Sequence, residues 1–596
     1  MFIKEPSLQL PSPRLKIRPR NSVIEATALS QGLHPIIARI LASRPLPDDD
    51  LPLQVLENKL VSLSSPWALK DIDKAATRVA TAIINQECIG IETDHDCDGQ
   101  TSHAVLFHNL IHRFGHPATK LRSYIGHRLS EGYGLSLGVA QRILNDEPRP
   151  TLIITADNGS SDEARIRLLQ EAGIDVIVTD HHELPQEGPP ISSYACLNPS
   201  RVDCSYADPF IAGCMVAWLL MAAVRQKLIA CHFLPTDTPS LSDSLDFVAV
   251  GTVADCVSMG RSYNNRAVVA AGLKLIQKRE RPCWQALEFI SAGISSEDLG
   301  FRIGPLLNSD GRLDTAFGSV SFLLAPTLAE AKEWVHHLQK HNSERKRIQQ
   351  DIVQKGLQIA LSQTALNQRA LSIYLADGHV GVHGIAASRI KDAFGRPTAF
   401  LAPKAGLGDL ISGSVRGIDG FHVREALQAM ADQYPKLFIA FGGHKGAGGF
   451  TIKAEDIACF QQAFDKAALL QLPENIQLGP ILWTDGELEA EFFDEDLLKY
   501  MDKLEPFGRE FEMPVFEVQA CIQEIRPIGD GRHARLKCRV HGRLVTAVWF
   551  SMRNNDSCPM PVSAQDLVKM AFVPKRNNMN HSLELQILHM KLIPAI

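Results

Sequence analysis

The sequence lacks the features that mark zinc-ribbon, secreted and membrane proteins. Its twelve cysteines include no Cys-x-x-Cys pair, which argues against a zinc ribbon and against a disulfide framework. The longest apolar runs, such as Val216–Val224, are shorter than the roughly 20 residues of a membrane span, and Met1–Arg20 has no continuous apolar segment of the signal-peptide kind. We therefore expect a cytoplasmic protein with reduced thiols and no membrane contact.

An excess of positive charge is also missing. The chain carries 61 Lys and Arg against 67 Asp and Glu, a net charge of −6, so any nucleic-acid site has to be a local basic patch. Hydrophobic residues make up 45% of the chain and charged residues 21%, which is typical of folded globular proteins and excludes general disorder. The length of 596 residues is enough for three or four domains.

Short β-branched apolar runs alternate with amphipathic stretches between about residues 85 and 260, a pattern typical of an α/β fold with a parallel sheet. The predicted strands are Ile89–Glu92, Leu152–Thr155, Val176–Thr179 and Phe247–Val250. Acidic or histidine residues follow each of these runs. Because ligand sites of open α/β sheets form at the carboxyl ends of the strands, we expect these side chains to meet in one crevice.

The segment Thr93–Ser102 carries Asp94, Asp96 and Asp98 at alternate positions just before Gly99. Carboxylates spaced in this way after a strand can bind Mg²⁺ or Mn²⁺, whereas the alternative is an acidic surface turn. An EF-hand is the weaker interpretation, because no Asp or Glu stands at the twelfth position of the loop.

Three further segments add acids and imidazoles. Asp157 follows the second predicted strand, the sequence D-H-H at Asp180–His182 follows the third, and Asp255 follows the fourth. Asp157 and Asp255 could instead be helix caps. Adjacent histidines behind an aspartate favour a metal site, because one imidazole can bind the ion while its neighbour faces a phosphate.

The rest of the chain indicates further domains. A proline-free stretch predicts a linking helix over residues 327–362, and a glycine-rich run at Phe441–Gly449 closes a second, smaller α/β region. Short alternating strands from about Val515 predict a net basic β-barrel, in which Trp549, Phe550 and Phe572 either stack on bases or fill the core. We expect an N-terminal extension at 1–70 and domains at 71–326, 363–460 and 461–596.

The order D-x-D-x-D-G, a lone Asp, D-H-H and G-T-V-A-D resembles the four phosphoesterase motifs of the DHH superfamily. Other motifs resemble its RecJ-like exonucleases, namely Ser123–Leu135, Asn265–Ala267 and Arg302–Leu313, the DHHA1-like Gly381–Arg389 and Phe441–Phe450, and Leu504–Gly508 before an oligonucleotide-binding (OB) barrel. Leu306 and Asp310 depart from the RecJ-like pattern, which has an arginine and a small apolar residue there.

The resemblance implies a site with two Mn²⁺ or Mg²⁺ ions. Their ligands would be Asp96, Asp98, Asp157, His181 and Asp255, with Asp94 as a further metal residue. The implied catalytic residues are Asp96, Asp98, Asp157, His181 and His182, and Asp180 supports them. The implied substrate-binding residues are Arg128, Asn308, Arg312, Ser388, Arg389, Gly442, Gly443 and His444.

The resemblance also implies an activity, that of a 5′ to 3′ exonuclease specific for single-stranded DNA, acting in repair and recombination. It implies a monomer whose candidate protein partners are a single-strand-binding protein and a helicase. Two alternatives are a phosphodiesterase for short oligonucleotides or dinucleotides and a non-catalytic replication scaffold. The basic C-terminal region argues against the first, and the complete set of acids and histidines argues against the second.

Overall fold

The computed structural model describes residues 10–48, 52–127, 131, 133–313, 317–404, 409–553, 560–577 and 580–594. The chain divides into two compact units. The N-terminal unit comprises Arg20–Ser343 and Asp502–Met513. The C-terminal unit comprises Met1–Pro19, Glu344–Met501 and Pro514–Ile596.

The N-terminal unit is built on a five-stranded, wholly parallel sheet with the order β3-β2-β4-β5-β6. Its strands are β2 (Ile89–Thr93), β3 (Leu121–Ile125), β4 (Leu152–Ala156), β5 (Asp175–Thr179) and β6 (Ala195–Leu197). Every residue of β2 and β4 is buried, because a parallel sheet is covered on both faces. The chain passes from β2 to β3 on one side and returns to β4 on the other, so β2 and β4 flank the point where a ligand crevice is expected.

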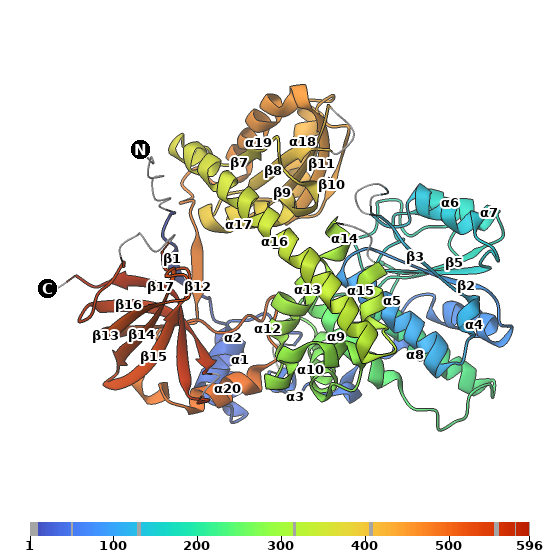
Figure 1. The fold of residues 1–596 in the computed structure, drawn as a ribbon, viewed down its shortest axis with the longest axis horizontal. Helices are drawn as coiled ribbons and strands as arrows, with labels where there is room; N and C mark the ends of the chain where they lie inside the picture. Colours follow the sequence, from blue (N-terminus) through green and yellow to red (C-terminus); the bar gives the residue numbers. More distant parts are fainter. Residues whose placement is uncertain are drawn as a thin grey trace. The chain divides into compact units, whose positions relative to one another are not determined.

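Helices cover both faces of this sheet (Figure 1). One face packs against α6 (Leu137–Asn145) and α7 (Glu163–Glu171), whose apolar side chains form one core with β4 and β5. The other face carries α4 (Ile72–Ile84), α5 (Cys97–His108) and α8 (Gly213–Ala230). The remaining helices of the unit are α1 (Ser22–Ser30), α2 (Pro35–Ala42), α3 (Gln54–Glu57), α9 (Leu245–Ala254), α10 (Tyr263–Lys278), α11 (Pro282–Ala286), α12 (Ser296–Asp298), α13 (Gly304–Leu307), α14 (Asp310–Leu313) and α15 (Phe317–Leu323).

The strand predicted at Phe247–Val250 is wrong, because these residues lie inside α9. The run Leu245–Ala254 is apolar apart from Asp246 and Thr252, and its first eight residues are buried. Such a run has neither the alternation of a half-exposed strand nor the stripe of an amphipathic helix, so periodicity cannot separate the two structures. Asp255 is therefore the C-cap of a helix and not the end of a strand.

Helix α8 contains the apolar run Val216–Val224. Among the described residues it is long and apolar enough to cross a membrane, but 61% of it is buried inside the protein. It packs against α4, α5 and α9, as the core helix of a globular domain does.

The segment Asp502–Met513 is held to the N-terminal unit by a buried arginine of α10. Arg266 is 1% exposed. Its guanidinium donates to the carbonyls of Val55 (2.8 Å), Pro506 (2.9 Å) and Leu504 (3.0 Å) and lies 4.2 Å from the ring centroid of Phe511. Burial lowers the pKa of Arg266 to about 9, because the charged guanidinium has lost its contact with water. The carbonyl oxygens replace part of that hydration and stabilise the buried charge.

A 38-residue helix, α16 (Leu328–Ala365), leads along the chain from one unit to the other and agrees with the predicted linking helix. The C-terminal unit then forms a mixed sheet with the order β10-β11-β9-β8-β7. Its elements are β7 (Leu371–Tyr374), α17 (Val380–Phe394), β8 (Thr398–Pro403), β9 (Leu410–Arg416), α18 (Val423–Gln433), β10 (Ala440–Gly443), β11 (Ala447–Lys453) and α19 (Ile457–Gln471).

A closed five-stranded barrel with the order β13-β14-β15-β17-β16 completes this unit. Its strands are β13 (Phe516–Ile528), β14 (His533–Val540), β15 (Arg543–Trp549), β16 (Leu567–Arg576) and β17 (Leu583–Leu592), preceded by α20 (Asp496–Leu504). Phe572 is fully buried and fills the core, whereas Phe550 is 53% exposed. Apart from the barrel, β1 (Arg14–Ile17) pairs in parallel with β12 (Ile481–Thr484). These features confirm the predicted α/β fold with a C-terminal barrel.

Candidate metal centre

The first acidic cluster lies in the turn between β2 and α5. Asp96 is the N-cap of α5, and its Oδ1 accepts from the backbone N–H groups of Asp98 (3.0 Å) and Gly99 (3.2 Å). A Cβ at position 99 would lie 2.3 Å from the carbonyl oxygen of Asp94, so only glycine allows the turn to close this tightly. The turn therefore places Asp94 and Asp98, both buried, on the same end of the sheet.

Asp157 follows β4 in a left-handed conformation, with φ of 65°. Its backbone N–H donates to Thr179 O (2.9 Å) at the end of β5, and its side chain is 2% exposed. A non-glycine residue in this region of the backbone is uncommon and often marks a functional site. The predicted helix-cap alternative does not apply, because α7 begins later, at Glu163.

The D-H-H segment follows β5 and is organised by its aspartate. Asp180 Oδ1 accepts from the backbone N–H of His181 (2.7 Å) and lies 2.8 Å from Nδ1 of His182. Partial burial opposes the charged form of His182, but the hydrogen bond and charge of Asp180 raise its pKa to about 9. His182 is 45% exposed, whereas His181 is 11% exposed, so the two imidazoles face different surroundings.

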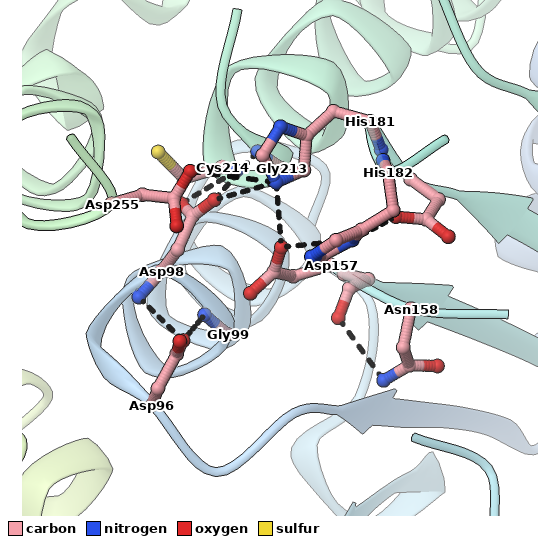
Figure 2. Close-up of polar contacts among 12 residues, drawn as sticks. Asp96, Asp98, Gly99, Asp157, Asn158, His181, His182, Gly213, Cys214 and Asp255 are labelled. Atoms are coloured by element: carbon pink, nitrogen blue, oxygen red, sulfur yellow. Dashed lines mark hydrogen bonds and ion pairs between the residues drawn. The ribbon is translucent and has the colours of Figure 1, made fainter. Parts of the chain in front are cut away.

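Three carboxylates converge on His181. Its Nε2 lies 3.2 Å from Asp157 Oδ1, 3.6 Å from Asp255 Oδ2 and 3.8 Å from Asp98 Oδ2, and Figure 2 shows these groups around one point. The backbone N–H groups of Gly213 (2.6 Å) and Cys214 (3.0 Å), at the start of α8, orient the Asp98 carboxylate. The first turns of two helices thus hold this acid in a fixed position.

The electrostatics of the cluster call for a cation. Burial, followed by the charges of Asp98 and Asp96, raises the pKa of Asp157 well above its usual range, and the same causes raise the pKa of Asp255. Asp157 Oδ1 and His181 Nε2 are buried and have no hydrogen-bond partner among the described residues. Metal ligation satisfies both groups and removes the repulsion among the acids, so the residues fit divalent cations.

Two sets of metal-ligating side chains belong to this cluster. The ligand atoms of Asp98, His181 and Asp255 lie within 4.8 Å of one another, and so do those of Asp94, Asp96 and Asp157. Asp157 also groups with His181 and His182, which places it between the two sets. The structure thus brings together all the side chains that the sequence analysis assigned to metal binding, including Asp255 on its helix.

Two residues near the centre were not predicted. Tyr133 OH donates to the carbonyl of Asp157 (3.2 Å) and lies 3.0 Å from Nε2 of His182. Glu92 is fully buried in β2, and burial, together with Asp162 and Asp94, raises its pKa. An acid among the apolar residues of a predicted strand was a visible signal for Glu92. Tyr133 lies in the RecJ-like motif Ser123–Leu135, but the sequence analysis gave it no role of its own.

Asn308 supports the acidic turn. Its Oδ1 accepts from the backbone N–H of Cys97 (2.9 Å), which stands between Asp96 and Asp98. The sequence analysis assigned Asn308 to substrate binding, and the contact described here is with the protein instead. Arg128 and the side chain of Arg312 lie outside the described residues.

The other predicted substrate-binding residues belong to the C-terminal unit. Ser388 and the exposed Arg389 lie on α17, where Ser388 Oγ donates to the carbonyl of Gly384 (3.2 Å). The glycine-rich run is a β-hairpin and not an open loop, because Gly442 and Gly443 of β10 pair with Gly449 and Gly448 of β11. His444 lies in the turn, and its N–H donates to Ala447 O (2.8 Å).

The chain matches known families along most of its length. It matches the DHH family N-terminal domain over residues 88–252, the DHHA1 domain over 367–469 and the RecJ OB domain over 484–590. A curated relative, the single-stranded-DNA-specific exonuclease RecJ of Haemophilus influenzae, is 34% identical over 87% of this chain and 90% of its own length.

Solved structures agree with the fold. Thermus thermophilus RecJ in complex with Mn²⁺ superposes with a TM-score of 0.75 at 24% identity, covering 98% of this chain and 80% of that one, and its Mg²⁺ complex gives a TM-score of 0.71 at 23% identity, covering 98% and 79%. An exonuclease RecJ bound to manganese is 30% identical, with a TM-score of 0.56 over 68% of this chain and 96% of its own. These three solved structures of RecJ thus contain bound Mn²⁺ or Mg²⁺. On the strength of the 34% identity across nearly the whole of both chains, this chain belongs to the RecJ family.

Proposed function

We propose that this chain is a single-stranded-DNA-specific exonuclease that degrades its substrate from the 5′ end with two divalent cations, Mn²⁺ or Mg²⁺. The observation that carries the proposal is the convergence of Asp98, Asp157 and Asp255 on His181. Family membership supplies the substrate class. The set of acids and imidazoles is complete, which argues against a non-catalytic scaffold.

We assign one cation to Asp98, His181 and Asp255 and the other to Asp94 and Asp96, with Asp157 shared between them. The two groups of ligand atoms support this assignment. When bound, such a pair of cations activates a water molecule and stabilises the charge that develops in phosphodiester hydrolysis. Mn²⁺ suits the site because it accepts carboxylate and imidazole ligands together.

The protein's own groups have separate tasks in this proposal. Asp180 holds Nδ1 of His182 (2.8 Å), and a substrate phosphate would replace the Tyr133 hydroxyl as the partner of Nε2 on the half-exposed ring. Tyr133, 3.0 Å from that nitrogen, fixes the plane of the ring. The amides of Gly213 and Cys214 keep the Asp98 carboxylate in one orientation.

Further residues are proposed to hold the strand. Arg128, Ser388, Arg389 and His444 would contact phosphates, with Gly442 and Gly443 allowing close approach of the backbone. On the barrel, Arg535, Lys537 and Arg539 are exposed along β14, while the residues between them point inward. This alternation presents a row of cations to solvent. The exposed ring of Phe550 directly follows β15, the strand paired with β14, and a single-strand site combines such cations with aromatic faces.

The remaining assignments rest on family membership alone. We propose that the protein acts in the cytoplasm, as a monomer, in repair and recombination, alongside a single-strand-binding protein and a helicase. The domain limits given in the sequence analysis remain predictions.

The test is digestion of 5′- and 3′-labelled strands with Mn²⁺ by the wild-type chain and by Asp157→Ala and His181→Ala. Each variant should lose at least about 100-fold in turnover, because losing a direct ligand should cost at least as much as losing the partner of a ligand. Asp175→Asn is the matched control, since Asp175 stands at the opposite end of β5. Circular dichroism verifies the fold. Near wild-type activity in a folded Asp157→Ala variant would refute the metal assignment, and shortening from the 3′ end would refute the polarity.

A further inference from the structure

A second group of metal-ligating side chains lies in the N-terminal unit, on α14 and α16 and away from the strand ends. His337 and His341 are four positions apart on α16 and therefore share one face of the helix. Asp310, the first residue of α14, faces them. Its Oδ1 lies 3.1 Å from Nε2 of His337 and 2.9 Å from Nδ1 of His341, and the three ligand atoms lie within 4.8 Å of one another.

The aspartate is held rigidly. Asp310 is 1% exposed, and a Cβ at Gly318 would lie 2.4 Å from its Oδ2, so the carboxylate packs directly against the backbone of α15. Among the described residues it is paired with no Lys or Arg; its ion pairs there are with the two imidazoles. A buried carboxylate is costly without a positive partner, and the two imidazoles converge on the same oxygen.

The histidines remain open to solvent. Their side chains are 38% and 20% exposed, and their ring centroids are 4.2 Å apart. An ion can therefore reach the group from the surface, and a water molecule can complete its coordination. Two imidazole nitrogens on successive helical turns and one carboxylate oxygen form a donor set that Zn²⁺ prefers, whereas Mg²⁺ prefers oxygen alone.

The segment that carries Asp310 also reaches the catalytic turn. Asn308, two residues earlier, accepts from the Cys97 N–H between Asp96 and Asp98. Ser309 Oγ donates to the carbonyl of Leu338 on α16 (3.2 Å). An ion bound by Asp310 and α16 would fasten this segment at a third point and so fix Asn308 against the acidic turn.

We propose that Asp310, His337 and His341 form a structural site for a zinc-type divalent ion, separate from the catalytic cations, which anchors the α13–α14 segment to α16. The position of the aspartate is one at which the chain departs from the RecJ-like pattern. The competing interpretation is a hydrogen-bonded His–Asp–His group without an ion.

The experiment measures Zn²⁺ binding to the full chain in saturating Mg²⁺, which competes for the oxygen-rich catalytic cluster. Wild type is compared with His337→Gln, His341→Gln and the matched control His336→Gln, whose residue is exposed on the same helix. Bound zinc is counted after dialysis, and Tm is recorded with and without Zn²⁺.

Wild type and His336→Gln should bind one more Zn²⁺ per chain than the other two variants, and their Tm should rise further on adding Zn²⁺. Loss of either histidine should weaken this site at least about 100-fold. X-ray absorption at the zinc edge of the loaded wild-type chain, which requires no variant to fold, should show imidazole ligands. Equal zinc content and equal Tm response in all four proteins would overturn the proposal, as would a wild-type chain that binds no Zn²⁺.

Discussion

Replacing Arg266 with Met should destabilise the N-terminal unit by about 3–5 kcal/mol. Arg266 is 1% exposed and donates to the carbonyls of Val55, Pro506 and Leu504 at 2.8–3.0 Å. Removing the guanidinium leaves these three acceptors buried without a donor, at about 1–3 kcal/mol each before relaxation. The loss of the contact with the Phe511 ring adds to this cost.

Two variants calibrate this value. Arg261→Met removes the 3.1 Å ion pair with Glu510, which joins the same two chain segments but is half-exposed, so it should cost no more than about 1 kcal/mol. The destabilisation caused by Arg266→Lys should lie between those of Arg261→Met and Arg266→Met, since one ammonium group cannot reach three carbonyls spread around a planar guanidinium.

The assay is urea unfolding of the full chain, with hydrogen exchange to assign each transition to a unit because the chain is not a single cooperative domain. The amides near Leu504 and Phe507 should lose protection in Arg266→Met before those of β2 and β4. An Arg266→Met variant within about 1 kcal/mol of wild type, with unchanged exchange at residues 502–513, would show that the arginine does not hold this segment.

Three further predictions follow from other parts of the structure. Burial lowers the pKa of His103 to about 4, so the folded state binds fewer protons than the unfolded state below the usual pKa of 6.5. The contribution of His103 to the free energy of unfolding is then fully present above pH 6.5 and is lost as the pH falls towards 4, by about 2 kcal/mol between pH 7 and 5. His103→Gln should remove this contribution to the pH dependence of the free energy of unfolding, measured by urea titration at each pH. The same pH dependence in wild type and variant would contradict the prediction. Gly99→Ala should reduce nuclease turnover at least about 100-fold while circular dichroism stays unchanged, because its Cβ would collide with the Asp94 carbonyl and displace the acidic turn; wild-type turnover would show that the turn relaxes without cost. A chain ending at Met513 should keep the Arg266 contacts and retain cleavage of very short strands. A chain ending at Leu504 loses Pro506 and Phe511 from those contacts and should therefore unfold at a lower urea concentration. Equal urea midpoints for the two truncated chains would show that residues 505–513 do not stabilise the N-terminal unit.

The sequence was sufficient to locate the main strands and the acids that follow them. The runs at Ile89–Glu92, Leu152–Thr155 and Val176–Thr179 are short, β-branched and followed by polar residues, and each is a strand of the parallel sheet. The run at Phe247–Val250 is just as apolar, but it is part of a longer buried segment, and a helix that is buried all round leaves no periodic signature. Asp255 was nevertheless placed in the right crevice, because α9 ends beside His181.

Other features depend on contacts that no local pattern records. The group formed by Asp310, His337 and His341 joins residues 27 and 31 positions apart. Asn308 was recognised from its motif, but its partner Cys97 is 211 positions away. The resemblance assigned Gly442 and Gly443 to substrate binding but did not give their conformation. Small residues permit both open loops and close strand pairing, and only the register of β10 with β11 decides between them.

The pairing of β1 with β12 imposes an order on folding during synthesis. Arg14 of β1 binds Gln477, just before β12, and the two are 463 positions apart. At about 5–20 residues per second, the ribosome needs about 25–90 s to deliver the partner of a strand that emerged first. Once residue 343 has been made, residues 20–343 can fold for about 7–27 s before Gln477 is made, while Arg14–Ile17 stays an unpaired edge. A slow, late docking of the N-terminal strand is the expected consequence, and in the nascent chain its cationic side chains, Arg14 and Lys16, keep that edge from pairing with other chains.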